Sequence, residues 1–336
     1  MAGHPVLVFD IGGTNVRGAV CDPGSGRPIE TAWRATPNYL DCPGRDAERL
    51  FAVTVAEMAA VGRELTGGVP PAAVVVGWPG PVAPDGTALR SPTILGPELD
   101  RPLPVGAAAA ELWPTSQVAT LNDLSAAGYA YVGQGCSDFC IVTVGSGIGN
   151  KVFVDGRPLV GPGGRGGEIG HGLAHMPEDC PAGAVGPGAR LGEVASGRGA
   201  LRLARRLAGA CPEAFAGSML APTRGGFDER GLVGAFLAGD GFARRAVELA
   251  AVPLGRALAG LHVGVGTERF VLTGGFATAL GEPYRRLVAA AARDGCWDVG
   301  QDWDGMVEIG TEEDGLVGGG VYAVRELLGR GVRVAA

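Results

Sequence analysis

Three glycine-rich turns in this chain could bind a nucleotide, the first two its phosphates and the third its base or ribose, and each follows an apolar run. They are Asp10-Ile-Gly-Gly-Thr-Asn15, Val144-Gly-Ser-Gly-Ile-Gly149 and Leu272-Thr-Gly-Gly275. Glycines let backbone N–H groups approach a polyphosphate closely, and the Thr14 hydroxyl adds a further donor. A carboxylate beside phosphates is useful when a divalent cation lies between them, which makes Asp10 a candidate Mg²⁺ ligand. Ordinary turns in a glycine-rich chain are the alternative interpretation.

The pair Asn122-Asp123 follows another apolar run and precedes a stretch of small residues. Asp123 could simply cap a helix. In a phosphoryl-transfer site, however, a carboxylate takes the proton from the attacking hydroxyl, and a weak base is sufficient because the transition state is loose. We therefore take Asp123 as the candidate base and Asn122 as a residue that orients the acceptor.

Glu168 and His171 end the glycine-rich segment 163–171. A carboxylate and a neutral imidazole at this spacing can bind neighbouring hydroxyls of a sugar ring. The alternative is that Glu168 caps a turn and His171 lies on the surface. Lys151, the only lysine, either reaches the phosphates or is a solvated surface residue.

Alternating strands and helices must position these residues. We expect strands over 6–9, 16–21, 29–35, 72–77, 118–121, 139–144, 152–154, 158–160 and 270–272, and helices over 45–65, 106–112, 125–132, 192–207, 232–237, 241–261 and 315–328. The first two strands should pair antiparallel, and Asp155-Gly156 is typical of a hairpin turn.

The composition limits the class of protein. A chain of 336 residues is long for one core, so two lobes are expected. The net charge of −7, with no basic cluster, argues against nucleic acid as a partner. The 7 scattered cysteines indicate a reducing, cytoplasmic protein. No leader is expected before the first strand, and charges or glycines interrupt the apolar stretches before membrane-spanning length.

In order and spacing, these motifs resemble the ROK family of sugar kinases, within the actin-like ATPase superfamily. Besides the turns and pairs above, Gly77-Trp-Pro-Gly-Pro-Val82 is similar to a family segment, and Asp314-Gly-Leu-Val-Gly-Gly319 resembles the start of the family's C-terminal helix. The resemblance covers nearly the whole chain. It implies a two-lobed α/β fold of the actin-like (ribonuclease H-like) type, with mixed sheets flanked by helices and a cleft between the lobes. We expect a small lobe of residues 1–121 plus 316–336 and a large lobe of 122–315.

The resemblance also assigns roles to individual residues. Asp123 is the expected catalytic base, and Asp10 is expected to hold Mg²⁺ through water. Expected ATP contacts are Asp10, Gly12, Gly13, Thr14, Asn15, Gly145, Ser146, Gly147, Gly149, Gly274 and Gly275. Expected substrate contacts are Asn122, Glu168, His171, Glu193 and Gly80, and a homodimer is implied.

Two departures from the family pattern bear on the function. Many members bind structural zinc through the His and three cysteines that follow it, whereas here only Cys180 remains, with Ala182 two places on, so we expect no zinc site. A weak substitute of His171, His175 and Cys180 is the alternative. The family Glu that follows this cluster has its nearest counterpart in Glu193, shifted by one residue.

The acceptor segment departs as well. Where similar kinases carry Pro-Asn and then Gly-Trp, this chain has Pro92-Thr93 and Gly96-Pro97. Because that Asn would contact ring hydroxyls, its replacement puts glucose in doubt.

We expect ATP-dependent phosphorylation of an exocyclic, primary hydroxyl of a hexose or hexose-like cyclitol, with a C7-cyclitol (valiolone-type) 7-kinase as the alternative. A sugar-sensing regulator without kinase activity is disfavoured, because only 9 residues precede Asp10 and leave no room for a DNA-binding domain. A non-catalytic sugar-binding relative is disfavoured by the intact Asp123 and phosphate turns.

Overall fold

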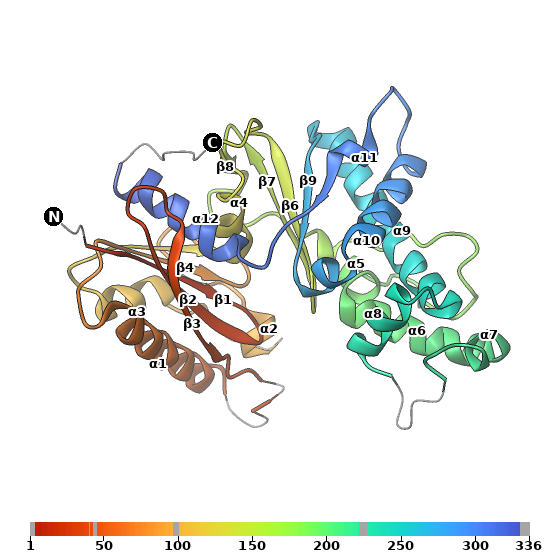
Figure 1. The fold of residues 1–336 in the computed structure, drawn as a ribbon, viewed down its shortest axis with the longest axis horizontal. Helices are drawn as coiled ribbons and strands as arrows, with labels where there is room; N and C mark the ends of the chain where they lie inside the picture. Colours follow the sequence, from red (N-terminus) through yellow and green to blue (C-terminus); the bar gives the residue numbers. More distant parts are fainter. Residues whose placement is uncertain (1–3, 40, 43–45, 97–100, 222–226, 330–336) are drawn as a thin grey trace. The chain divides into compact units, whose positions relative to one another are not determined.

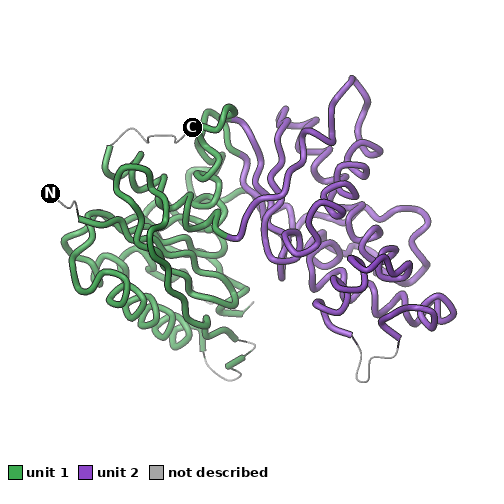
Figure 2. Tube along the Cα trace, in the orientation of Figure 1, with its two compact units in different colours: residues 1–137, 153–166, 313–336 green, residues 138–152, 167–312 purple. Residues whose placement is uncertain are grey.

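The computed structural model describes residues 4–39, 41–42, 46–96, 101–221 and 227–329. The chain divides into two compact units (Figure 2). Unit 1 comprises residues 1–137, 153–166 and 313–336, and unit 2 comprises residues 138–152 and 167–312.

Unit 1 thus continues past residue 122, where the sequence suggested the change of lobe. The physical reason is that helix α4 (Asp123–Gly128) packs on helix α12 (Asp314–Tyr322), where Gly318 lies so close to the α4 backbone that no β-carbon would fit.

Unit 1 is built on a five-stranded mixed sheet with the order β3-β2-β1-β4-β5 (Figure 1). Its strands are β1 (Val6–Ile11), β2 (Asn15–Cys21), β3 (Pro28–Ala35), β4 (Ala73–Trp78) and β5 (Gln117–Asn122). β1 pairs antiparallel with β2, as expected, and parallel with β4, which pairs parallel with β5. The parallel pairing brings the carboxyl ends of β1, β4 and β5 to one edge of the sheet.

Helices cover both faces of this sheet because successive β1 side chains point to opposite sides. Leu7 and Phe9 pack with α1 (Ala47–Thr66) and α3 (Val105–Leu112), whereas Val6 and Val8 pack with α12. The sequence encodes the limits of α1, since Asp46 accepts a hydrogen bond from the Arg49 amide at its start and Gly67, with φ of 56°, ends it. A short helix, α2 (Pro92–Leu95), precedes α3.

The second five-stranded sheet has the order β10-β9-β6-β7-β8. Its strands are β6 (Phe139–Val144), β7 (Ile148–Val154), β8 (Arg157–Pro158), β9 (Phe270–Thr273) and β10 (Val307–Ile309). β9 lies between β6 and β10 and is parallel to both. The β7–β8 hairpin turns at Asp155 and Gly156, with φ of 51° and 70°, as the Asp-Gly pair predicts.

Unit 2 packs its helices around α9 (Gly241–Val265). They are α5 (Leu191–Val194), α6 (Gly197–Ala210), α7 (Pro212–Ala216), α8 (Glu229–Leu237), α10 (Gly275–Asp294) and α11 (Trp303–Met306). Among the described residues, α9 is the one helix long and apolar enough to cross a membrane, which the sequence analysis did not anticipate. Within its most apolar window 56% is buried inside the protein, and core helices of soluble proteins have the same properties.

Several expected helices have different limits in the structure. The helix expected over 125–132 is α4, which ends at Gly128. The stretch 192–207 is broken into α5 and α6, because Ser196 caps α6 by accepting a hydrogen bond from the Gly199 amide at 3.0 Å. The C-terminal helix continues from α12 into a π-helical turn over Ala323–Leu327.

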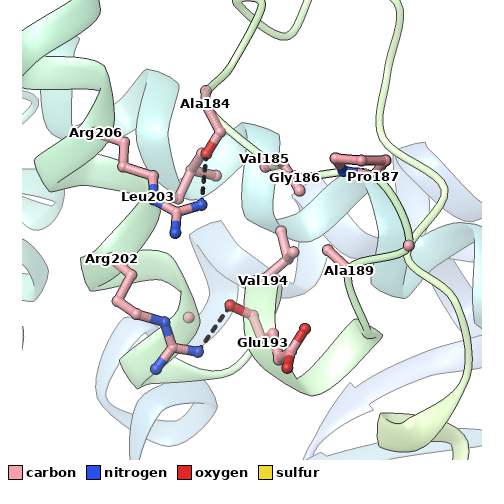
Figure 3. A pocket seen from close by; sticks show the side chains of 12 residues that line it. Ala184, Val185, Gly186, Pro187, Ala189, Glu193, Val194, Arg202, Leu203 and Arg206 are labelled. Atoms are coloured by element: carbon pink, nitrogen blue, oxygen red, sulfur yellow. Dashed lines mark hydrogen bonds between the residues drawn. The ribbon is translucent and has the colours of Figure 1, made fainter.

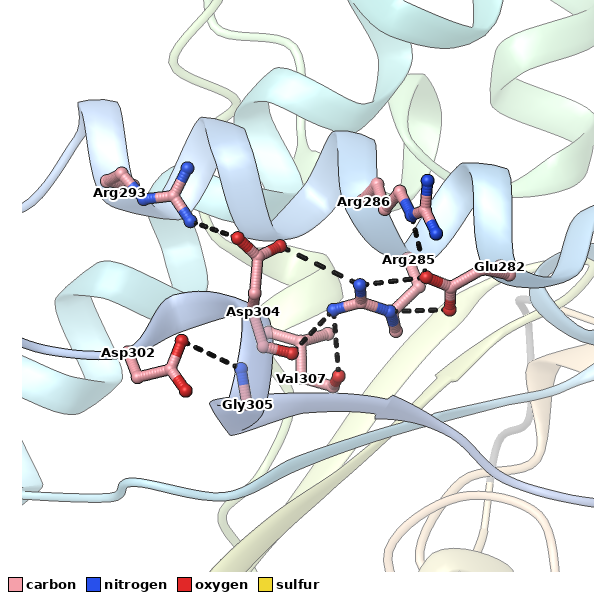
Figure 4. Close-up of polar contacts among 8 residues, drawn as sticks. All are labelled: Glu282, Arg285, Arg286, Arg293, Asp302, Asp304, Gly305 and Val307. Atoms are coloured by element: carbon pink, nitrogen blue, oxygen red, sulfur yellow. Dashed lines mark hydrogen bonds and ion pairs between the residues drawn. The ribbon is translucent and has the colours of Figure 1, made fainter.

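The sequence analysis did not identify α10 and β10. Arg285 on α10 joins them: its guanidinium donates to Asp304 O at 2.7 Å and to Val307 O at 3.3 Å, and it pairs with Glu282 (Figure 4).

Candidate active site

The first glycine turn is tied to the segment that follows β3. The Gly12 amide donates to Asn15 O at 2.9 Å, which closes the turn. The Thr36 hydroxyl donates to Gly12 O at 2.8 Å, and Asn38 Nδ2 donates to Gly13 O at 3.1 Å. These bonds fix the backbone of the turn, and a fixed backbone is what a phosphate-binding loop requires.

Asp10 lies one residue before the end of β1 and is only 9% exposed. Its carboxylate pairs with Arg17, which lies opposite it on β2. Gly315 lies against the same carboxylate so closely that no β-carbon would fit. Mg²⁺ in nucleotide sites typically takes one or two carboxylates together with water and substrate phosphates. Asp10 could supply such a carboxylate and hold the ion through water.

Asn122 and Asp123 stand where β5 gives way to α4. Asn122, and not Asp123, caps the helix, with its Oδ1 accepting from the Ser125 amide at 3.1 Å. The Asn122 amide nitrogen donates to Gly80 O at 2.9 Å and to Asp123 Oδ1 at 2.7 Å. Asp123 Oδ1 also accepts from the Leu124 amide at 2.8 Å. The carboxylate of the candidate base is therefore held by at least two donors.

Gly80 adopts φ of 97°, a conformation that favours glycine, and a β-carbon there would collide with Arg90 O. The neighbouring segment is fixed by Ser91, whose buried hydroxyl donates to Pro79 O at 2.9 Å. Thr93, which stands in place of the family Asn, lies against Gly13, and its hydroxyl is buried with no hydrogen-bond partner in the described part of the chain. Pro97 lies outside the described residues.

In unit 2 the second and third glycine turns are adjacent, because β6 and β9 pair in parallel with Thr143 opposite Thr273. The Gly145 amide donates to Gly147 O at 3.1 Å, and Gly145 O accepts from the Gly197 amide at 2.8 Å. Gly274 has φ of 90° and lies against β6, with no room for a β-carbon. Helix α10 begins at Gly275, so its N-terminus lies beside the second turn, and helix N-termini favour anions.

Glu168 is close to a buried cation. Lys151 is 1% exposed, and its Nζ lies 3.7 Å from Glu168 Oε1. The suggestion that Lys151 is a solvated surface residue is therefore wrong. Burial raises the pKa of Glu168 above its usual range, and the positive charges of Lys151 and His171 oppose the shift. The sequence analysis missed this pairing, although the uniqueness of Lys151 was a signal.

His171 and Glu193 are both exposed. The backbone oxygen of His171 accepts a hydrogen bond from Arg190, and Glu193 Oε2 accepts from the Arg190 amide at 2.9 Å, at the start of α5. Glu193 also lines a pocket of about 530 Å³ together with Arg202, Arg206 and the segment 184–189 (Figure 3).

The segment that holds zinc in many ROK proteins is stabilised here by other contacts. Asp179 pairs with Arg245, and burial raises the pKa of the Cys180 thiol, which disfavours the thiolate that would bind a metal. In the described ranges, no group of three or more His, Cys, Asp or Glu side chains is arranged to hold a metal ion.

Comparison with known proteins places this geometry in a family. The ROK family model matches residues 6–298. The chain is 35% identical over 342 aligned positions to a C(7)-cyclitol 7-kinase of Streptomyces hygroscopicus, with 97% of this chain and 96% of that protein covered.

Two solved structures are also similar. A ROK family glucokinase from Streptomyces griseus, in complex with glucose and AMPPNP, has a TM-score of 0.72 and 26% identity, covering 94% of this chain and 98% of that one. The ROK hexokinase from Thermus thermophilus has a TM-score of 0.68 and 28% identity, covering 97% and 99%. The fold class expected from the sequence, an α/β protein with two mixed sheets flanked by helices, is confirmed, and the chain belongs to the ROK family.

Proposed function

We propose that this protein transfers the terminal phosphoryl group of ATP to the exocyclic primary hydroxyl of a C7 cyclitol. The chain is an ATP-dependent sugar or cyclitol kinase. The observation that carries the choice of acceptor is the near full-length similarity to a C(7)-cyclitol 7-kinase, at 35% identity, against 26% for the glucokinase. The replacement of the ring-contacting Asn by Thr93 supports an acceptor other than glucose.

Asp123 acts as the general base in this proposal. Its Oδ1 is fixed by Asn122 and by the Leu124 amide, so the carboxylate is held in one orientation before the acceptor binds. Preorganisation of this kind lowers the entropy cost of bringing base and hydroxyl together. Since the proton leaves late in a loose transition state, a carboxylate of ordinary basicity is adequate.

The glycine turns bind ATP in this proposal: Gly12, Gly13, Thr14 and Asn15 in unit 1, and Gly145, Ser146, Gly147, Gly149, Gly274 and Gly275 in unit 2. Asp10 would hold Mg²⁺ through water. When bound, the ion neutralises charge on the triphosphate. Gly80, Asn122, Glu168, His171 and Glu193 are proposed to contact the acceptor. The proposed enzyme is a cytoplasmic homodimer, and light scattering tests the dimer.

The test is ADP release with Mg-ATP across matched acceptors: valiolone-type C7 cyclitols, glucose and N-acetylhexosamines. We expect turnover of a C7 cyclitol with a kcat/KM well above that for glucose. A preference for glucose would refute the acceptor assignment and leave the kinase intact. Binding of ATP without turnover on any acceptor would favour a sensing role.

Two variants separate catalysis from folding. Asp123→Asn should bind ATP and acceptor but lose at least about 10²-fold in kcat, the contribution of a general base. Asp46→Asn changes a carboxylate that caps α1 in the same unit and should leave kcat unchanged. Full activity of Asp123→Asn would exclude Asp123 as the base.

A further inference from the structure

Lys151 stands out because it is the only lysine of the chain and is buried. It lies on β7, just after the second glycine turn, and only 1% of its surface is exposed. Arginine supplies every other basic side chain apart from histidine. A fully buried ammonium is costly unless a counter-charge lies close to it, and Glu168 is that counter-charge.

The backbone around the pair is rigid. Gly167 has φ of 78°, and a β-carbon there would lie 2.8 Å from Lys151 Nζ, so glycine leaves the space that the ammonium occupies. Asn150 connects the two segments. Its backbone amide donates to Gly167 O at 3.0 Å, and its side-chain Oδ1 accepts from the Ile169 backbone amide at 3.2 Å. Lys151 and Glu168 therefore face each other from segments that are fixed relative to one another within unit 2.

We propose that Lys151 is a positioning residue for Glu168: its buried ammonium keeps the carboxylate ionised and in one orientation, so that Glu168 accepts a hydrogen bond from a ring hydroxyl of the acceptor. This inference rests on the proposed function, in which Glu168 contacts the acceptor. The Glu168 side chain is 35% exposed and the Lys151 side chain 1%. The carboxylate can therefore be reached from solvent, while the ammonium behind it is buried.

The electrostatics give a direction for the effect. Among the described residues, two further titratable groups interact with the pair: His171 with Glu168, and Cys140 on β6 with Lys151. Burial raises the pKa of the Cys140 thiol to about 12, so it stays neutral at physiological pH. Burial also raises the pKa of Glu168, and Lys151 opposes that rise. Removing the ammonium lets this pKa rise further, so the acidic limb of kcat/KM for the acceptor should move to higher pH.

Because there is one lysine, its ammonium can be observed without ambiguity. Protein labelled with ¹⁵N-lysine should give one side-chain ammonium signal, with protons protected from exchange by burial. In Glu168→Gln the titration of that signal should move to lower pH, because the buried cation loses its counter-charge. An unchanged titration midpoint, or rapid exchange typical of a solvated lysine, would overturn the pairing. This measurement does not depend on any turnover.

Kinetics test whether Lys151 acts through Glu168. We expect Lys151→Met to lower kcat/KM for the acceptor about tenfold and to leave KM for ATP unchanged. Loss of a residue that orients a metal-binding side chain has an effect of about this size. In the Glu168→Gln background the same substitution should have no further effect, and Lys151→Arg should restore part of the activity. Equal losses in both backgrounds would overturn the proposal.

A matched control is Arg269→Met, which removes another cation from unit 2. Arg269 directly precedes β9 and pairs with Glu308 on β10 at 2.7 Å. This variant should leave kcat/KM and its pH profile unchanged, and a shift like that of Lys151→Met would mean that any lost ion pair perturbs the site.

If the wild type phosphorylates an acceptor other than a C7 cyclitol, the assignment of the acceptor is wrong. The Lys151 and Glu168 variants are then compared with the acceptor that is phosphorylated. If nothing is phosphorylated, the proposed function fails, and the ammonium titration alone decides between pairing and its absence.

Discussion

The double role of Asn122 leads to a prediction that links stability and catalysis. Its Oδ1 caps α4, and its amide nitrogen bonds Gly80 O and Asp123 Oδ1. Asn122→Ser keeps a capping oxygen but removes both amide donors. Asn122→Ala removes the cap as well.

The magnitudes follow from the bonds lost. A hydrogen bond between neutral groups contributes about 1 kcal/mol, and one to a charged acceptor somewhat more, so Asn122→Ser should lower the free energy of unfolding by about 2 kcal/mol. Losing the cap costs about 1 kcal/mol more, so Asn122→Ala should be lower by about 3 kcal/mol. Both variants free Asp123 Oδ1 from the same donor, and both should lose kcat about tenfold or more, and to a similar extent.

The assay is urea unfolding together with ADP release at saturating ATP and acceptor. Asp228→Ala is the matched control, since Asp228 caps α8 by accepting from the Gly231 amide at 2.7 Å. It should lose about 1 kcal/mol without a change in kcat. Wild-type kcat in Asn122→Ser would refute the idea that Asn122 orients the base. Equal stability of the Ser and Ala variants would refute the capping role.

Three further predictions follow from packing and burial. Gly128→Ala should lower the unfolding temperature by several degrees, because its β-carbon would overlap the Phe153 ring; unchanged thermal unfolding would contradict this. Burial opposes ionisation of Asp240, but hydrogen bonds from backbone amides and a hydroxyl outweigh burial and lower the pKa of Asp240. Asp240→Asn should therefore be less stable than the wild type at pH 7. In urea titrations that difference should disappear as the pH falls through the folded-state pKa, below about 4. Cys140, with a pKa of about 12, should react with a thiol reagent at pH 8 only after unfolding, and rapid reaction of the native protein would show that β6 opens locally.

Local signals predicted most of the elements around the site. The strands of unit 1 follow from apolar runs between glycine turns, and Asp46 and Gly67 mark both ends of α1. The glycine turns end β1, β6 and β9 as expected. These features depend on residues close in sequence, which is why one sequence was enough.

The elements missed depend on distant contacts. Helix α10 begins without a capping side chain and contains Pro283 and a kink at Gly281, so its sequence lacks the usual helix signals. Strand β10 has only 3 residues and is defined by its pairing with β9. The hydrogen bonds from Arg285 to Asp304 O and Val307 O stabilise this region, and no local sequence pattern predicts them.

Lys151 shows the same limit at the level of one side chain. A lysine on a strand is most often solvated, so composition favours the surface. The structure buries it because a counter-charge 17 positions later is brought to within 3.7 Å by the bonds of Asn150. Charge pairing between segments is not encoded in the spacing of residues along the chain, so this ion pair could be identified only from the structure.

Asn122 and Asp123 illustrate how one dipeptide divides two tasks that sequence reasoning had treated as exclusive. The sequence left Asp123 as either the cap of a helix or a catalytic base. In the structure the cap belongs to Asn122, and Asp123 is the first residue of the helix, where the field of the helix N-terminus favours a negative charge. The cap thus does not compete with the base but positions it, since the side chain that starts α4 also donates to Asp123 Oδ1. This is why a substitution at Asn122 should affect stability and catalysis together, whereas caps elsewhere should affect stability alone.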